Sequence, residues 1–507
     1  MTPASFLLST CALLPAALML AAMPHRRGTA VPAWGRFRAL TLAGFAATLA
    51  SLALQLAAAP ALAVLPPGLG ASLTGAWVAV LVQLLGTVIG VFSSRYLQGE
   101  PDQPRYVAAF SGVLAAVHLL LLADHWLVLI AAWAAVNIAL QHLLCFYTDR
   151  PFALLAAHKK RLADRLADLL LIAAAALAWN EVGSGSLPAL WRHLETGGPS
   201  AALQASAVCL ALAVVLRTAL LPVHGWLIQV MEAPTPVSAL LHAGVVNLGG
   251  FVLIRFAPLL EAAPVARWLL VGIGLATALL AGLVMLTRVS IKVRLAWSTV
   301  AQMGFMVMEC GLGLYTLALL HLIGHSLYKA HAFLAASAAV ENTRLRMMRS
   351  GGGPSVASLV FAPLAAAGLV ALPVAAVPLG AWPWWWSGVL ALAWAPLLWL
   401  PVAQDRDAPG VGHRLLAGAA IVAGLVTAAL VGHALPFGLT DAPHAAAGLV
   451  ALAGMAALYL CLAVLQARPQ ALATWRRWIY AGFYIDEFST RAALHLWPTR
   501  WTPAAAK

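Results

Sequence analysis

The chain has 507 residues, of which 63% are hydrophobic and only 9% are charged, and its formal net charge is +13. A soluble domain carries about 25% charged residues, so this composition excludes a soluble globular protein and predicts an all-α polytopic protein of the lipid bilayer. The basic residues lie in short clusters between apolar runs, as in the loops of membrane proteins, and no basic–aromatic module indicates a nucleic-acid partner.

The apolar runs along the chain predict the membrane spans. Because a helix needs about 20 apolar residues to cross a bilayer, we expect about fifteen spans, within a range of roughly 13–16. The first of them is expected to be retained rather than cleaved. The predicted spans lie near residues 4–23, 39–64, 71–93, 107–123, 125–146, 166–180, 203–221, 237–257, 266–287, 295–313, 315–338, 356–379, 382–402, 415–434 and 444–466.

The loops between these runs predict the orientation, because cytoplasmic loops are enriched in lysine and arginine. With the N-terminus outside, the outward loops hold little more than Arg192 and Arg267. The inward loops then hold clusters that include Arg36, Arg38, Lys159, Lys160, Arg288 and Arg476. We therefore predict a periplasmic N-terminus and a cytoplasmic C-terminus in a bacterial inner membrane. The aromatic and charged segment 467–507 is expected to lie as an amphipathic helix at the inner surface or to dock against a partner subunit.

The seventh and eighth spans contain the stretch RTALLPVHGWLIQVMEAPTPVSALLHAGVVNLGGFVLIR, from residue 217 to residue 255. Its prolines, Pro222, Pro234 and Pro236, each remove a helix N–H, so a broken helix is expected here. Free backbone groups are tolerated at membrane depth only where protein or water surrounds them. Together with Arg217 and His242, the break therefore indicates an ion path rather than a lipid-facing anchor.

Three ionisable residues fall on one stripe of the eleventh span, HLIGHSLYKAH. His321, His325 and Lys329 are spaced at i, i+4 and i+8, which places them on one face of a helix. Because imidazoles titrate near neutral pH, such a stripe can pass protons stepwise. The alternative is that these groups only form hydrogen bonds with neighbouring helices.

Other charged residues in or near apolar runs are candidates as well. Arg165 and Asp168 are spaced at i, i+3 and can pair, either as a structural pair or as a switching pair. Arg217 stays protonated, so its role can only be electrostatic. Glu232, beside the Pro-Thr-Pro sequence, is expected in a functional site or a partner contact. Lys292 is expected to mark the inner membrane surface or to enter a cavity.

The sequence APTPVSALLHA, preceded by RTALLPVHGW, resembles the signature of the proton-translocating antiporter-like subunits of respiratory complex I and of multisubunit cation/proton antiporters. Further matches follow in the same order over roughly residues 90–340: FSSRYLQGE, ADHWLVLIAAW, DRLAD, IKVRLAWSTVAQMGF and HLIGHSLYKAHAFLAA. The resemblance implies a bundle of about fourteen to sixteen helices with two inverted five-helix repeats, each with a broken helix.

The resemblance also implies roles for individual residues. Asp168 and Arg165 match the family's buried acid–arginine pair, and Arg217 stands where the family usually has a pumping lysine. His242 matches the neighbouring histidine of the family. The residues that match its central hydrophilic axis are Lys292, His321, His325 and Lys329.

Several departures from the complex I pattern point to one branch of this superfamily. Trp133 is followed by Ala134 rather than a glutamate, 356–379 contains no lysine, and Glu232-Ala233 precedes the Pro-Thr-Pro motif. With the segments HSLYKAHAFL and FYIDEFSTR, these differences resemble the DabB family, the membrane subunits of two-component inorganic carbon accumulation systems. That resemblance implies a partner of the DabA type, a zinc protein similar to β-type carbonic anhydrases. The zinc would belong to the partner, and this chain would hold no metal or cofactor and would not be catalytic alone.

A weak internal repeat completes the expected organisation, since the twelfth span carries Pro373 and Pro378 much as the seventh carries Pro222. The expected parts are N-terminal helices (1–106), a first antiporter-like repeat (107–257), a second repeat (258–402), C-terminal helices (403–466) and a tail (467–507).

Three functional hypotheses follow. The first is an ion-conducting subunit, with H⁺ favoured over Na⁺, that drives CO₂ hydration and bicarbonate accumulation by the zinc partner. The second is a proton-pumping subunit of complex I or of a multisubunit antiporter. The third is a membrane scaffold for the partner that no longer conducts ions.

Overall fold

The computed structural model describes residues 3–23, 30–57, 64–198, 200–336, 353–377, 381–401, 410–468, 470 and 472–499. These residues are helical almost throughout, and none of them forms a β-strand. The helices are α1 (Pro3–Ala22), α2 (Ala30–Ala57), α3 (Leu73–Tyr96), α4 (Gln103–Leu121), α5 (Trp126–Leu144), α6 (Pro151–Val182), α7 (Leu187–Thr196), α8 (Ala201–Arg217), α9 (Gly225–Gln229), η1 (Val230–Glu232), α10 (Thr235–Ala243), η2 (Val245–Asn247), α11 (Leu248–Arg255), α12 (Ala257–Glu261), α13 (Pro264–Leu286), α14 (Ile291–Leu312), α15 (Tyr315–Leu334), α17 (Val356–Ala375), α18 (Trp384–Trp394), η3 (Ala395–Leu398), α19 (Val411–His433), α20 (Ala445–Ala467), α21 (Ala473–Tyr480), η4 (Gly482–Tyr484) and α22 (Ile485–Leu496).

Each of the fifteen predicted spans overlaps a helix. In the described part of the chain, ten helices are long and apolar enough to cross a membrane by length and composition, while α8 and α18 are shorter apolar helices. Helices α6, α14 and α15 are also long but carry ionisable side chains. The prediction of an all-α polytopic membrane protein is therefore confirmed.

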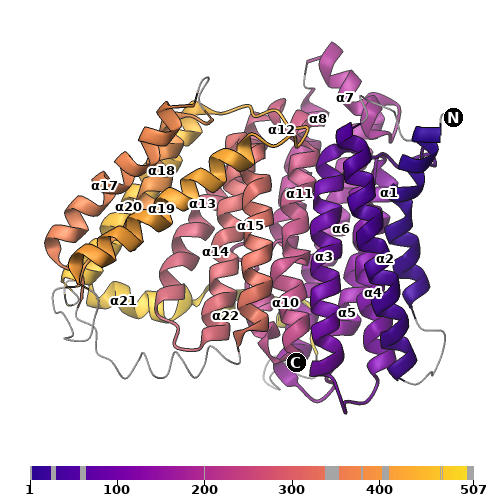
Figure 1. Ribbon diagram of the computed structural model, residues 1–507, viewed down its shortest axis with the longest axis horizontal. Helices are drawn as coiled ribbons and strands as arrows, with labels where there is room; N and C mark the ends of the chain where they lie inside the picture. Colours follow the sequence, from indigo (N-terminus) through magenta and orange to yellow (C-terminus); the bar gives the residue numbers. More distant parts are fainter. Residues whose placement is uncertain are drawn as a thin grey trace.

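The bundle has two parts that share a boundary (Figure 1). Helices α1 to α15 surround a large apolar core, and α17 to α20 pack around a smaller core that contains Trp385 and Trp386. Helices α13 and α15 contact α20 and α19, respectively, and so join the two parts. Helices α21 and α22 cross the lower end of the bundle, at the end opposite to α7 (Figure 1).

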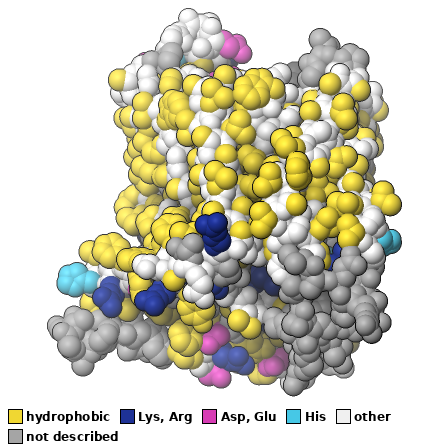
Figure 2. Space-filling model, turned by 90° about the vertical axis from the view of Figure 1, so that its left-hand side faces the viewer, with side chains coloured by type: hydrophobic (Ala, Val, Ile, Leu, Met, Phe, Trp, Pro, Cys, Tyr) yellow, Lys and Arg dark blue, Asp and Glu magenta, His cyan; other side chains and the backbone are white. Residues whose placement is uncertain are grey.

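The outer surface has the polarity that a bilayer requires. Figure 2 shows hydrophobic side chains over the middle of the face formed by the C-terminal helices, and lysine and arginine side chains near its lower end. The tail at that end exposes aromatic side chains, among them Trp478, Tyr484 and Phe488. Charged and aromatic groups therefore flank an apolar belt, as they do at a membrane–water interface.

The chain is interrupted where the prolines predict a break. Helix α8 ends at Arg217, the Leu221–Pro222 bond is cis, and α9 begins at Gly225. Pro234 precedes α10 and Pro236 lies in its first turn, where the missing N–H of proline costs no helix hydrogen bond. The path then bends again at Gly244, between α10 and η2. Two close interruptions therefore lie inside the bundle.

The second predicted interruption, in 356–379, differs from the first. Residues 356–375 form the continuous helix α17 in spite of Pro363 and Pro373, and Pro378 lies outside the described residues. A proline leaves the carbonyl four residues earlier without its helix partner. The hydroxyl of Tyr459 on α20 donates to that carbonyl, the oxygen of Leu359, at 2.8 Å. A neighbouring helix thus replaces the missing hydrogen bond.

Candidate functional site

Helix α15 carries the three predicted stripe residues on one face. His325 and Lys329 are buried, and the rings of His321 and His325 lie 6.1 Å apart between centroids. Glu309, on the adjacent helix α14, is also buried, and its Oε2 lies 2.8 Å from Nδ1 of His321. Two imidazoles and an ammonium group therefore follow one another along α15, and a carboxylate from α14 contacts the first imidazole. We call these four residues, together with His242, the α15 cluster.

Lys329 lies deep in the protein with polar but uncharged neighbours. Its Nζ donates to the carbonyl oxygen of Leu295 at 2.9 Å and to the hydroxyl of Ser298. Among the described residues, no carboxylate forms an ion pair with it. An unpaired buried charge is costly, so a lysine in this place indicates a functional role rather than a contribution to packing.

His242 joins this cluster from α10. Its Nδ1 lies 3.0 Å from the hydroxyl of Thr299, and its ring stacks on Phe333 at 4.5 Å between centroids. Phe333 is one helical turn beyond Lys329 on α15. The first kinked helix thus brings its histidine to the Lys329 end of the stripe.

A cavity of about 820 Å³ opens onto the other end of the cluster. Its wall includes Glu309, His321, His325 and Gln302, and its far side is made by α18, α19 and α20. Neither ring nitrogen of His325 has a hydrogen-bond partner among the described residues. A cavity of this size has room for several waters, each of which occupies about 30 Å³ in the liquid. The polar side chains on this wall give water the hydrogen-bond partners that the apolar remainder of the cavity lacks.

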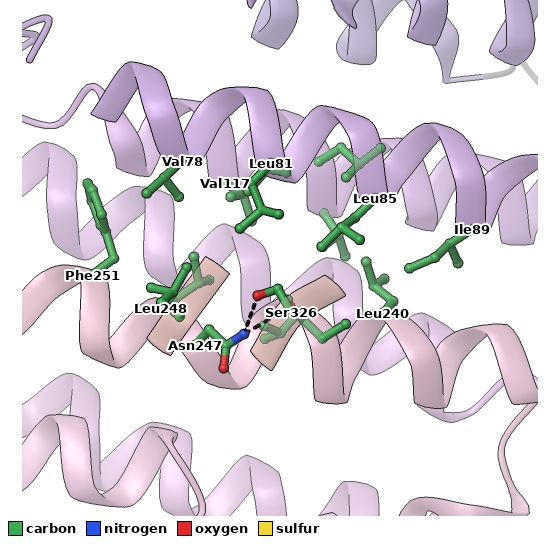
Figure 3. Close-up of a pocket in the computed structure, with 17 residues that line it drawn as sticks. Val78, Leu81, Leu85, Ile89, Val117, Leu240, Asn247, Leu248, Phe251 and Ser326 are labelled. Carbon is green, nitrogen blue, oxygen red and sulfur yellow. Dashed lines mark hydrogen bonds between the residues drawn. The ribbon is translucent and has the colours of Figure 1, made fainter. Parts of the chain in front are cut away.

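The opposite side of α15 is closed by apolar packing at the bend between α10 and α11. Asn247 Nδ2 donates to the hydroxyl of Ser326 at 2.7 Å and to the carbonyl of Ala243 at 2.9 Å (Figure 3). Leucine, valine and isoleucine side chains of α3 and α4 line a pocket of only about 30 Å³ there (Figure 3). The bend is therefore tied to the stripe helix and sealed on the side of α3.

A second group of charges lies between α6 and α8. Arg217 pairs with Asp168, and its guanidinium carbon lies 4.4 Å from the ring centroid of Trp133. Arg165 also pairs with Asp168, as its i, i+3 spacing predicted, but the expectation that Arg165 is the buried partner is wrong. The Arg165 side chain is 72% exposed and its closest contact with Asp168 is 3.8 Å, whereas the Arg217 side chain is 2% exposed. Arg217 is the buried partner because its side chain approaches Asp168 from α8, on the buried face of α6.

Sequence reasoning missed a further buried pair. Lys160 Nζ lies 2.5 Å from Oδ2 of Asp164 and 3.0 Å from the amide oxygen of Asn137. Lys159 and Lys160 were expected in an inward loop because the sixth span was predicted to begin at residue 166, but α6 begins at Pro151. The signal was present, since Lys160, Asp164 and Asp168 repeat every four residues. Lys160, Asp164, Asp168 and Arg217 are called the α6 cluster below.

Two predicted path residues lie apart from both clusters. Glu232 Oε2 accepts a hydrogen bond from the backbone N–H of Phe152 at 3.2 Å. The first turn of a helix has free N–H groups and a positive partial charge, so Glu232 acts there as a cap of α6. Lys292 donates to the hydroxyl of Thr235 at 2.9 Å and is only partly buried. The structure thus separates these two residues from the others.

The exposure of Arg165 leads to a direct prediction. We expect Arg165→Gln to leave ion transport within about twofold of the wild type, because exposed substitutions and exposed ion pairs have small effects. Ion flux into proteoliposomes that contain the purified protein measures this. A loss as large as that of Arg217→Gln would contradict the assignment of Arg217 as the functional partner of Asp168.

Comparison with known proteins gives consistent matches. The family model for the transmembrane part of NADH:quinone oxidoreductase and Mrp antiporter subunits matches residues 123–400. The chain is 38% identical over 451 residues to a probable inorganic carbon transporter subunit DabB of Hydrogenovibrio crunogenus, and the match covers 85% of each protein. It is 43% identical over 299 residues to a probable subunit DabB2 of Halothiobacillus neapolitanus, which covers 59% of this chain.

Solved structures show the same fold. A chain of the Mrp complex from Dietzia sp. superposes with a TM-score of 0.56 and 24% sequence identity, over 96% of this chain. This chain spans 54% of the length of the DabB2 relative and 52% of that Mrp chain. It is thus similar to DabB over most of its length and to about half of the longer antiporter subunit.

Proposed function

Because the chain belongs to the NADH:quinone oxidoreductase/Mrp antiporter family and, within it, to the DabB proteins, we propose that its ion transport drives the accumulation of inorganic carbon by a partner subunit. The chain is a multi-pass, ion-transporting membrane subunit. The observation that supports the proposal best is the α15 cluster, in which three ionisable side chains follow α15, Glu309 of α14 contacts the first of them, and that end faces a cavity.

The chemistry of the cluster favours protons as the transported ion. Each of its side chains on α14 and α15 can gain and lose a proton: Glu309, His321, His325 and Lys329. In a proton transfer, the donor and acceptor atoms lie within hydrogen-bond distance or are linked by a single water. A hard cation such as Na⁺ prefers several oxygen ligands, whereas nitrogen atoms dominate this cluster. Protons are proposed to pass between Glu309–His321 and Lys329 through His325 and water in the cavity.

The α6 cluster would set the electrostatic state of the path. Arg217 remains charged at all accessible pH values, so Asp168 and Asp164 must compensate both it and Lys160. If the Arg217–Asp168 pair opens, the charge that faces the neighbouring helices changes. This change is proposed to couple the two clusters. No hydrogen bond among the described residues joins them directly.

The proposed partner is a zinc subunit of the DabA type, and the complex would hydrate CO₂ to bicarbonate on the inner side of a bacterial inner membrane. The zinc would be held by that partner, and this chain would supply the energy from the ion gradient. The proposed orientation has the N-terminus in the periplasm and the C-terminal tail in the cytoplasm, at the end where lysine and arginine gather in Figure 2.

Growth in air tests the function. A bacterium without carbonic anhydrases is expected to grow in ambient air only when it expresses this chain together with its DabA-type partner. An uncoupler should abolish the rescue, because the partner then has no ion gradient to use. Growth of the strain with the partner alone would contradict the proposal, and expression of both chains must be verified by immunoblot.

Two other functions remain candidates and are distinguished by the same strain. A subunit of a respiratory complex or cation antiporter, as the family model also covers, would change salt tolerance rather than growth in air. A scaffold that does not conduct ions would support rescue after neutralisation of Lys329, and rescue would survive the uncoupler. The uncoupler and a Lys329 variant therefore separate all three.

A further inference from the structure

The C-terminal tail reaches back into the bundle through one carboxylate. Asp486, at the start of α22, has Oδ1 2.5 Å from Nζ of Lys159 on α6, and its Oδ2 accepts from Nε2 of Gln229 on α9 at 2.9 Å. The hydroxyl of Thr490 accepts a second hydrogen bond from Lys159 at 2.6 Å. Residues more than 250 positions apart in sequence are thus joined beneath the broken helix.

The backbone of α9 is shaped to admit this carboxylate. A Cβ atom placed on Gly225 would lie 1.4 Å from Oδ1 of Asp486. Any other residue at position 225 would therefore displace Asp486 from its place against Lys159. Gly225 is the first residue of α9, directly after the interruption that follows Pro222. The interruption after Pro222 and the C-terminal tail thus contact each other at Gly225 and Asp486.

Asp486 forms the outermost of three ion pairs that follow one another along α6: Asp486–Lys159, Lys160–Asp164 and Asp168–Arg217. A helix rises about 1.5 Å per residue, so Asp168 lies roughly 13 Å further along α6 than Lys159. The Lys159 side chain is 6% exposed, whereas the Asp486 side chain is 26% exposed. Asp486 therefore touches both solvent and the buried charges.

We propose that Asp486 is the inner access residue of the α6 cluster, a carboxylate supplied by the tail that exchanges protons between the aqueous phase and Lys159. This inference rests on the proposed function, since it assumes that the chain conducts protons. It lets protons reach the α6 cluster, so the charge of that cluster, which is proposed to control the path along α15, depends on a residue of the tail. It also makes conduction depend on the packing of α22 against α6 and α9, because release of α22 would remove the Asp486 carboxylate from Lys159.

Proton flux tests the role of Asp486. The full complex of this chain and its DabA-type partner is reconstituted in proteoliposomes, a potassium diffusion potential drives proton entry, and an internal pH-sensitive dye reports the flux. Asp486→Asn is expected to lower the flux by about 10²-fold, the usual effect of removing a positioned proton-transfer group. Asp486→Glu should restore a large part of it.

Two further variants separate this role from a general effect on the tail. Glu487→Gln removes the same charge from the next residue, which is exposed, and should leave the flux within about twofold. Gly225→Ala keeps every charge but places a Cβ atom against both the Asp486 carboxylate and Lys159 Nζ, so it should separate this pair and resemble Asp486→Asn. Limited proteolysis of the tail shows whether α22 stays docked in each variant.

The outcomes are distinct. If the wild-type complex conducts and Asp486→Asn conducts equally well, the assignment of Asp486 is wrong while the proposed function stands. If Asp486→Asn and Glu487→Gln lose flux equally, the effect is one of net charge and the assignment is again wrong. If the wild-type complex itself conducts no protons, the proposed function fails, and the role of Asp486 fails with it.

Discussion

Replacing Lys329 with methionine is expected to abolish growth rescue in air and to reduce proton flux by about 10²-fold. Lys329 is fully buried and has no carboxylate partner among the described residues, so its ammonium group carries a desolvation cost that a proton-transfer role explains better than a structural role. Methionine has a similar length and is flexible, so it fills the same space. The readouts are growth in ambient air and flux in proteoliposomes.

The fold should survive this substitution. Loss of the ammonium removes one buried charge and two hydrogen bonds, but the Leu295 carbonyl still accepts from the hydroxyls of Ser298 and Thr299, so the cost is only about 1 kcal/mol. These effects oppose each other, so the amount of protein in the membrane is expected to stay near that of the wild type. Normal expression with lost flux would locate the defect in transport.

Lys292 provides a matched control. It is a lysine on α14 whose visible contact is one hydrogen bond to Thr235, worth about 1 kcal/mol, so Lys292→Met should change the flux less than about fivefold. If Lys292→Met loses as much flux as Lys329→Met, the path runs through the inner end of α14 as well. If Lys329→Met conducts normally, the stripe is structural and the scaffold hypothesis gains support.

The helices and the stripe of ionisable residues on α15 could be predicted from the sequence, because both depend on the geometry of a single helix. Positions four residues apart share one face of a helix, so His321, His325 and Lys329 could be aligned without any knowledge of their neighbours. The prolines likewise predicted the interruption near Pro222, because a missing N–H is a local property. Properties of a single helix are thus accessible from sequence.

Contacts between side chains on different helices could not be predicted in the same way. The pairing of Asp168 with Arg165 followed from local spacing, but the buried guanidinium comes from Arg217, 49 residues later. Asp486 joins Lys159 across 327 residues, and no local pattern indicates that contact. Proximity between distant residues depends on helix packing, which a single sequence does not display.

Other misses came from reading charge as a mark of the surface. Lys160 was placed in a loop because basic residues usually flank a span, yet Asp164 and Asn137 make its burial possible. Glu309 was overlooked although it is the carboxylate inside a long apolar run, and it pairs with His321. The rule that an intramembrane charge needs a partner would have identified both.

The Asp168–Arg217 pair should show the largest effect on stability. Asp168→Asn leaves the Arg217 guanidinium buried without its carboxylate, and breaking a buried pair in this way costs about 3–5 kcal/mol. Trp133 offers only a partial replacement through its ring face. We expect a lower midpoint of thermal unfolding for the purified complex and a reduced yield of protein from the membrane.

The double variant separates stability from transport. Asp168→Asn combined with Arg217→Gln removes both charges, so the penalty of an unpaired buried charge disappears and stability should return toward that of the wild type. Transport should not return, because Asp168 and Arg217 are proposed to set the charge that the neighbouring helices sense. Thermal unfolding and proton flux are measured on the same preparations. A double variant that is stable and also conducts like the wild type would show that the pair holds the fold and takes no part in the coupling of the two clusters.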